Sequence, residues 1–254
     1  MKQNVGNFVV SNNQGGYKMK TIIHKADSRG YADHGWLKSY HTFSFAGYHN
    51  PSRMHFGALR VLNDDFVAGG NGFGRHPHDN MEIISIPLEG TLAHGDSMGN
   101  EGTIQPNEIQ VMSAGTGVAH SEYNGSDVDP AKFLQIWLFP NKENVTPRYD
   151  QIKIDPADRK NKLQQVISPH PDDEGTWIHQ DAWFHLADLE AGNTLDYTLK
   201  GEGTGVYIFV LEGQLEIAGE ILDRRDAIGI TDVESITFTA KSTTSVLLME
   251  VPMV

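Results

Sequence analysis

Two pairs of residues in this sequence have the types and the spacing of metal ligands. The stretch "GFGRHPHDNMEI" contains His76 and His78, and "SAGTGVAHSEYN" contains His120 and Glu122. In a strand, alternate side chains point to the same face, so the members of each pair would project together. Three neutral imidazoles and one carboxylate suit Fe²⁺, Mn²⁺, Ni²⁺, Cu²⁺ or Zn²⁺, and an octahedral ion would keep two positions for water or substrate. The pattern therefore predicts a metal centre with room for catalysis.

Strand spacing alone does not identify the carboxylate ligand. Glu82 has the same strand parity as His76 and His78, so it could face the ion as readily as Glu122. Pro77 lacks an N–H, which restricts its segment to a sheet edge, a strand start or a bulge, where a cavity mouth is expected. Either carboxylate would complete the ligand set.

The glycines before the histidines allow other interpretations. A glycine-rich turn can bind phosphate, but a dinucleotide site needs a helix to begin directly after the turn. Here "RHPHDNMEIISIPLEG" continues as strand, which argues against a phosphate site. A single histidine pair can also be an ordinary surface feature. The second pair, in "SAGTGVAHSEYN", favours the metal centre.

The elements that must carry these side chains are short strands. Runs such as "GALRVLND", "MEIISIPLEG", "KFLQIWLFP" and "YIFVLEGQLEIAG" are rich in Val, Ile, Leu and aromatic residues and are bounded by turn residues. Runs of this length and composition are typical of antiparallel sandwiches and barrels. We therefore predict an all-β fold.

An internal similarity predicts two related β domains. "IPLEGTLAHGDS" at 86–97 resembles "FVLEGQLEIAGE" at 209–220, each a strand, a Leu-Glu-Gly turn and a second strand. When the turns are superposed, Leu199 and Gly201 take the places of His76 and His78, so imidazole chemistry belongs to the first domain. The expected organisation is a flexible leader (1–18), a metal-binding domain (19–140), a linker with connecting strands (141–182) and a carboxy-terminal domain without metal ligands (183–254).

Composition excludes several classes of function. The net charge of −13 opposes direct contact with nucleic acid. The absence of cysteine excludes disulfides and thiolate ligands, which leaves His, Asp and Glu for metal chemistry. The first residues lack the apolar region of a secretory signal. The sequence also contains no apolar run long enough to predict a membrane segment. A cytoplasmic location is the expectation that follows.

Four separated stretches carry a resemblance to a known family. "HTFSFAGYHNP", "LRVLNDD", "GFGRHPHDNMEI" and "SAGTGVAHSEYN" together resemble the pirins, bicupin proteins with two tandem cupin domains of the jelly-roll β-barrel type. The amino-terminal cupin of pirins binds metal. The resemblance is strongest over residues 21–140. It implies that His76, His78, His120 and Glu122 are the ligands, and it leaves Glu82 beside them. Against the general cupin pattern, Gly115 replaces a usual proline and Ile109 a usual glycine.

The resemblance also implies a function. Several bacterial pirins resemble quercetin 2,3-dioxygenases, so we expect a monomeric enzyme that uses O₂ to cleave a flavonol such as quercetin, with release of CO. Glu122 would be the catalytic general base on the 3-hydroxyl group, and Fe²⁺ the expected cofactor. Animal members of the family are iron-dependent co-regulators that bind transcription factors, so a protein-binding role without turnover is the alternative. A metal that only cross-links strands is a third interpretation.

Overall fold

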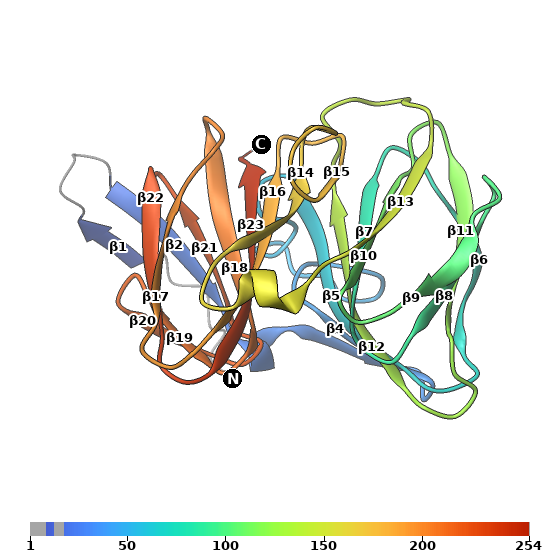
Figure 1. Ribbon diagram of the computed structural model, residues 1–254, viewed down its shortest axis with the longest axis horizontal. Coiled ribbons are helices and arrows are strands. Elements are labelled where there is room, and N and C mark those ends of the chain that lie inside the picture. Colours follow the sequence, from blue (N-terminus) through green and yellow to red (C-terminus); the bar gives the residue numbers. More distant parts are fainter. Residues whose placement is uncertain (1–8, 13–17, 254) are drawn as a thin grey trace. The chain divides into compact units, whose positions relative to one another are not determined.

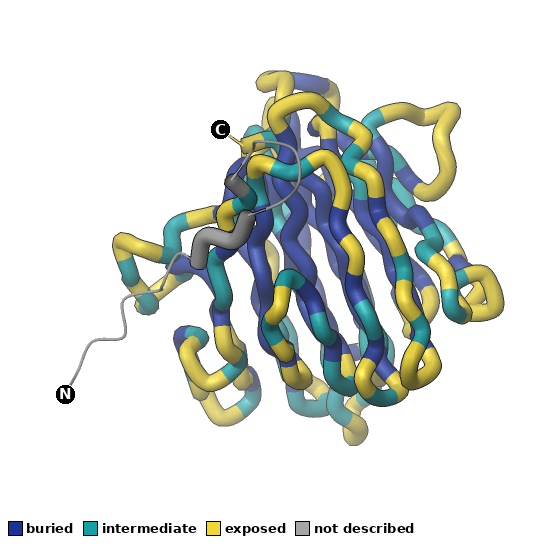
Figure 2. Tube along the Cα trace, turned by 90° about the vertical axis from the view of Figure 1, so that its left-hand side faces the viewer, coloured by how far each residue is buried: buried dark blue, intermediate teal, exposed yellow. Residues whose placement is uncertain are grey.

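Strands dominate the protein. The computed structural model describes residues 9–12 and 18–253, and these form mostly antiparallel strands joined by turns (Figure 1). The helices in this part of the chain are two 3-10 turns, η1 (Ala26–Ser28) and η2 (Pro156–Arg159), and neither is long and apolar enough to span a membrane. Buried residues concentrate in the strands and exposed residues in the turns (Figure 2). The all-β prediction is confirmed.

The described residues form two compact units, each built from separate stretches of the chain. Unit 1 contains the described residues up to Arg29, then Pro156–Ile167 and the described residues from Asp181 onward. Unit 2 contains Gly30–Asp155 and Ser168–Gln180. Each unit has its own hydrophobic core, and the metal-ligand candidates all belong to unit 2.

Two stretches near the expected domain boundaries form strands. Of the expected leader, residues 1–8 and 13–17 lie outside the described residues, whereas Val9–Asn12 form strand β1, paired with β2 (Lys18–His24). The segment 141–182 supplies strands to both units. Its β13 (Arg148–Lys153) pairs with β10 (Glu108–Ser113) of unit 2, and its β14 (Gln164–Ser168) pairs with β16 (Trp183–Leu189) of unit 1.

Unit 2 has two sheets, which run in the orders β13-β10-β7-β12-β5-β4-β3 and β6-β11-β8-β9. The strands are β3 (Gly30–Asp33), β4 (Leu37–His41), β5 (Leu59–Val67), β6 (Gly72–His78), β7 (Glu82–Glu89), β8 (Leu92–Asp96), β9 (Glu101–Ile104), β10 (Glu108–Ser113), β11 (Val118–Asn124), β12 (Ala131–Leu138) and β13 (Arg148–Lys153). The short β15 (Thr176–Trp177) also lies in this unit. Phe133 of the larger sheet packs with Leu92 and Ile104 of the smaller one, so the sheets face each other around a buried interior.

Unit 1 has the same two-sheet construction, in the orders β1-β2-β21-β18-β23-β16-β14 and β17-β22-β19-β20. Its further strands are β14 (Gln164–Ser168), β16 (Trp183–Leu189), β17 (Thr194–Thr198), β18 (Thr204–Glu212), β19 (Gln214–Ile217), β20 (Glu220–Asp223), β21 (Ala227–Thr231), β22 (Ser235–Ala240) and β23 (Thr244–Pro252). Val206 and Ile208 of the larger sheet share one core with Phe238 of the smaller sheet. The interior of unit 1 is thus mainly aliphatic.

The Leu-Glu-Gly turn that links the two halves of the sequence has the same backbone in both units. Gly90 joins β7 to β8 with φ 73°, and Gly213 joins β18 to β19 with φ 82°. A Cβ atom at these glycines would lie 2.5 Å from the carbonyl oxygen of Pro130 and 2.2 Å from that of Thr243, respectively. Positive φ and close backbone approach both require glycine. The shared motif therefore encodes a shared turn.

Candidate metal centre

Three histidines from two paired strands meet inside unit 2. Each of His76, His78 and His120 offers one ring nitrogen, and these three atoms lie within 4.8 Å of one another. Strand β6 pairs antiparallel with β11 so that His76 stands directly opposite His120. The centroids of these two rings are 4.5 Å apart, and the ring of His78 lies 4.9 Å from each. The predicted alternation is present, because Pro77 points outward and is exposed.

Glycines allow the two strands to approach closely here. A Cβ atom on Gly72 of β6 would lie only 2.4 Å from the Cα of Tyr123 on β11. The register between these strands shifts between His120 and Glu122. Gly115, in the turn before β11, has φ 46°, and a Cβ there would lie 2.0 Å from the carbonyl oxygen of Val145. The glycine-rich stretches thus shape the backbone that presents the histidines.

The chemistry of the three imidazoles fits a metal ion. His76 Nδ1 donates a hydrogen bond to the carbonyl oxygen of Gly74 at 2.8 Å. Nδ1 therefore carries the hydrogen, and Nε2 has the free lone pair. His78 Nε2 and both ring nitrogens of His120 are buried without a hydrogen-bond partner among the described residues. Buried polar atoms normally have a partner. A metal ion would supply one for each ring.

The protonation state of two of the histidines also fits a metal site. Burial, together with the neighbouring imidazoles, lowers the pKa of His78 to about 4 and that of His120 to about 3. Both rings are therefore neutral near pH 7. Only the neutral form of histidine binds a metal, so the two groups need not lose a proton first.

Glu122 lies on the same inward face of β11 as His120 but outside the group of three histidines. It is buried, and its two oxygens accept hydrogen bonds from the opposite sheet. Ser85 Oγ donates to Oε1 at 2.9 Å, and Gln135 Nε2 donates to Oε2 at 2.8 Å. A carboxylate oxygen has more than one lone pair, so these bonds leave acceptor capacity.

Glu82 occupies a different environment. The chain turns between His78 and Glu82, with φ 42° at Asn80, and Glu82 begins the separate strand β7. Ser113 Oγ donates a hydrogen bond to Glu82 Oε2 at 2.7 Å, and burial raises the pKa of this carboxyl to about 7. Strand parity counted from residue 76 to residue 82 therefore does not apply, because these residues belong to two strands in different sheets.

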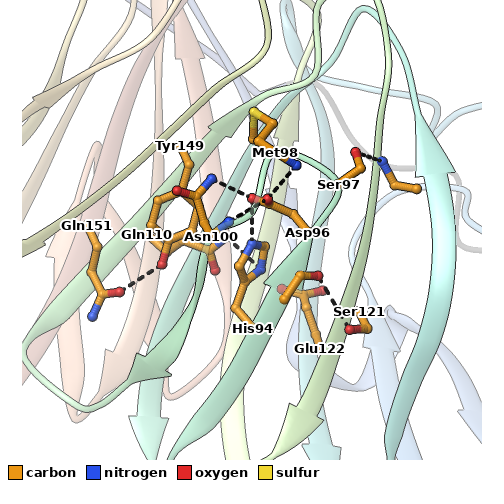
Figure 3. Close-up of polar contacts among 12 residues, drawn as sticks. His94, Asp96, Ser97, Met98, Asn100, Gln110, Ser121, Glu122, Tyr149 and Gln151 are labelled. Carbon is orange, nitrogen blue, oxygen red and sulfur yellow. Dashed lines mark hydrogen bonds and ion pairs between the residues drawn. The ribbon is translucent and has the colours of Figure 1, made fainter.

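His94 is a buried residue beside the centre that the sequence interpretation did not select. Its ring centroid lies 5.5 Å from that of His120. Gln110 Nε2 donates to His94 Nδ1 at 3.3 Å, which leaves Nε2 to donate to Asp96 Oδ2 at 3.1 Å (Figure 3). The "AHGD" stretch, an alternating pair inside the repeated segment, was the signal available for it.

A cavity adjoins the histidine group. It has a volume of about 590 Å³, and its wall includes His78, Met81, Val118 and Trp137, with Asp79, Ser97 and Thr116 as further polar members. The ring of Trp137 lies 4.9 Å from that of His78. Pockets of this size, with apolar walls and a few polar groups, are typical of small-molecule sites.

Facing antiparallel sheets with inward imidazoles on paired strands define a cupin-type metal protein. Comparison with known families agrees: residues 23–138 match the pirin family, and residues 165–251 match the quercetinase C-terminal cupin domain. A quercetin 2,3-dioxygenase of Escherichia coli K12 is 42% identical over 234 residues, which cover 91% of this chain and 98% of that protein. The chain belongs to the pirin family.

Further relatives and solved structures agree with this assignment. A pirin-like protein of Caulobacter vibrioides is 40% identical and covers 88% of this chain and 96% of its own length. The structure of the bacterial pirin YhhW from Escherichia coli in complex with nickel(II) superposes with a TM-score of 0.87, at 40% identity, over 92% of this chain and all of that one. The predicted fold of two tandem cupin domains is confirmed.

Proposed function

We propose that this pirin is a metal-dependent dioxygenase that cleaves a flavonol such as quercetin with O₂ and releases CO. The observation that carries the proposal is the cavity of about 590 Å³ whose wall includes His78 of the histidine group. We infer that a planar aromatic substrate reaches the centre through it. The name of the Escherichia coli relative, quercetin 2,3-dioxygenase, supports the choice of substrate.

The proposed ligands for the metal are His76, His78, His120 and Glu122, and Fe²⁺ is the first ion to test. The unpartnered imidazole nitrogens support a resident ion, and the nickel(II) complex of YhhW supports a divalent one. Zn²⁺, Mn²⁺, Ni²⁺ and Cu²⁺ suit the same donor set. When bound, such an ion would supply Lewis-acid chemistry to a substrate oxygen, and the redox-active ions of this group would also exchange electrons.

The residues of the chain have separate tasks in this proposal. Met81, Val118 and Trp137 offer an apolar wall that binds the flavonol rings and excludes water. Glu122 removes the proton from the 3-hydroxyl group and holds it at a carboxylate oxygen. The anionic ring that results is more reactive toward O₂. The overall reaction consumes one O₂ for each flavonol and yields one ester and one CO, so the proton held by Glu122 returns to the product.

The decisive test measures turnover with a defined metal. The protein is loaded anaerobically with Fe²⁺, its metal content is measured, and quercetin is added in an oxygen electrode with detection of CO. We expect O₂ uptake and CO release that disappear in His76→Ala. His170→Ala, at an exposed histidine of the same unit, is the matched control and should retain activity.

The opposite result has a definite meaning. Protein that holds one Fe²⁺ per chain but consumes neither O₂ nor quercetin would contradict the proposed activity. The regulatory role, with a protein partner in place of a substrate, would then become the better proposal.

A further inference from the structure

A row of polar side chains crosses the interior of unit 2. Five adjacent strands of its larger sheet contribute one residue each, and cross-strand register places these residues directly opposite one another. Residues directly opposite on antiparallel strands share one face of the sheet. All five side chains are buried. The row consists of Gln110, Ser85, Gln135, Asn63 and His41.

On one side, this row borders an apolar cluster. Two residues farther along the same strands, on the same face, are Met112, Ile83 and Trp137, which pack in an apolar cluster. An uncharged polar group costs free energy when it is buried unless it forms hydrogen bonds. A polar row beside such a cluster therefore needs partners inside the barrel.

The central members of the row find their partner in Glu122. Ser85 on β7 and Gln135 on β12 are cross-strand neighbours, and each donates to a different oxygen of the Glu122 carboxylate, at 2.9 Å and 2.8 Å. Glu122 belongs to β11 of the opposite sheet. Since both oxygens are held, the carboxylate cannot rotate about its terminal bond without losing both hydrogen bonds. The pair thus fixes the plane of the carboxylate group.

We infer that Ser85 and Gln135 are positioning residues that orient the Glu122 carboxylate toward the ion held by the three histidines. The inference rests on the proposed role of Glu122 as a metal ligand. Hydrogen bonds to a ligating carboxylate raise the affinity of a site, because the ligand no longer loses orientational freedom when the ion binds. Two uncharged donors also stabilise the negative charge while acceptor capacity remains for the ion.

The test measures metal affinity without any substrate. Ni²⁺ affinity is determined by competition with a chelator, and Co²⁺ is bound in parallel so that its visible absorption reports the ligand field. We expect Ser85→Ala and Gln135→Met each to weaken Ni²⁺ binding by about 10- to 100-fold and to shift the Co²⁺ bands. Thermal unfolding of each metal-free variant separates this effect from a general loss of stability.

A double-mutant cycle makes the role of Glu122 explicit. In the Glu122→Gln background the Ser85 and Gln135 substitutions should cause no further loss of affinity, because their route to the metal is already removed. Asn63→Leu is the matched control. It removes a buried amide of the same row that has no hydrogen bond to Glu122, and it should leave Ni²⁺ affinity and the Co²⁺ spectrum unchanged.

Several outcomes would overturn the inference. Wild-type affinity and spectrum in both single variants would do so, as would equal losses with and without the Glu122 carboxylate, or a Glu122→Gln variant that binds Ni²⁺ like the wild type. If one variant does not fold, the other carries the test. Wild-type protein that binds Ni²⁺ in this way but never consumes quercetin would refute the proposed activity alone.

Discussion

Glu122 of unit 2 and Glu250 of unit 1 are both buried under polar donors, and they differ in how many hydrogen bonds their oxygens accept. Glu122 of unit 2 accepts one hydrogen bond at each oxygen, from two uncharged side chains. Glu250 of unit 1, at 0% exposure, accepts bonds at 2.6–2.9 Å from four residues. These donors are Tyr197 Oη, the backbone N–H groups of Lys200 and Gly201, and Thr204 Oγ1.

The comparison separates a structural carboxylate from one with capacity to bind. The donors around Glu250 come from β17, the first residue of β18 and the loop between these strands, so its charge holds that loop in place. Glu122 instead stands two residues from His120, whose ring nitrogens have no partner among the described residues. Two units with the same Leu-Glu-Gly turn therefore have opposite interiors. The interior of unit 1 is an aliphatic core. The interior of unit 2 instead contains side chains that could bind a metal, among them the imidazole of His120.

The largest expected effect tests which unit holds the metal. His120→Ala removes an inward imidazole and should lower Ni²⁺ or Fe²⁺ affinity by more than about 100-fold, beyond the effect of losing a residue that only supports a ligand. His185→Gln changes a buried histidine of unit 1 and should leave one ion bound per chain. Metal analysis after gel filtration checks both. Equal metal loss in the two variants would contradict the contrast between the units.

The glutamates themselves should respond in opposite ways. Glu250→Gln replaces a carboxylate that accepts several hydrogen bonds by an amide with one acceptor oxygen, which should lower the free energy of unfolding by about 3 kcal/mol or more. Metal affinity should not change. Glu122→Gln should weaken metal binding with a smaller change in the stability of the metal-free protein. Denaturant unfolding and chelator competition, measured on both variants, would expose any reversal of this pattern.

The shared turn predicts where the two units behave alike. Ala at Gly90 or at Gly213 would combine positive φ with a Cβ clash against a backbone carbonyl. Each substitution should lower the free energy of unfolding by about 2–3 kcal/mol. Thermal or denaturant unfolding measures this. A turn that tolerated alanine in one unit only would show that the repeated sequence does not encode a repeated constraint.

Local patterns in the sequence were sufficient for much of the fold and part of the site. Alternation on one strand placed His76 beside His78, because a strand has a fixed period of two. The Leu-Glu-Gly repeat identified the common turn, because only glycine accepts that backbone. The pairing of β6 with β11, which brings His76 opposite His120, is a long-range register. The resemblance to the pirins implied the ligand set but not this register.

Patterns that depend on distant strands were less accessible. β2 pairs with β21, about 200 residues later in the chain, and no local signal near Lys18–His24 indicates that partner. In the sequence, Ser85 and Gln135 look like ordinary polar residues in apolar runs. Strand register places them side by side, and the facing sheet brings Glu122 to both. Strand parity could not distinguish Glu82 from Glu122 as the ligand, because a turn at Asn80 puts Glu82 on another strand.

The smallest expected effect concerns that choice. Burial raises the pKa of Glu82 to about 7, whereas an unfolded chain has it near 4.5. Between these values the unfolded state is ionised and the folded state keeps its proton, so this group lowers stability as pH rises from about 4.5 to 7. Glu82→Gln removes that contribution. The variant should therefore gain stability relative to the wild type, and the gain should grow as pH rises across this window.

Chemical denaturation at pH 5 and at pH 8 measures the difference, and Ni²⁺ affinity is measured on the same samples. Ser113 and Arg148, which face Glu82, remain in both proteins. A relative stability that does not change with pH would contradict the raised pKa. A loss of Ni²⁺ affinity in Glu82→Gln comparable to that in Glu122→Gln would make Glu82 part of the metal centre, so this variant tests whether Glu82 or Glu122 serves the histidines.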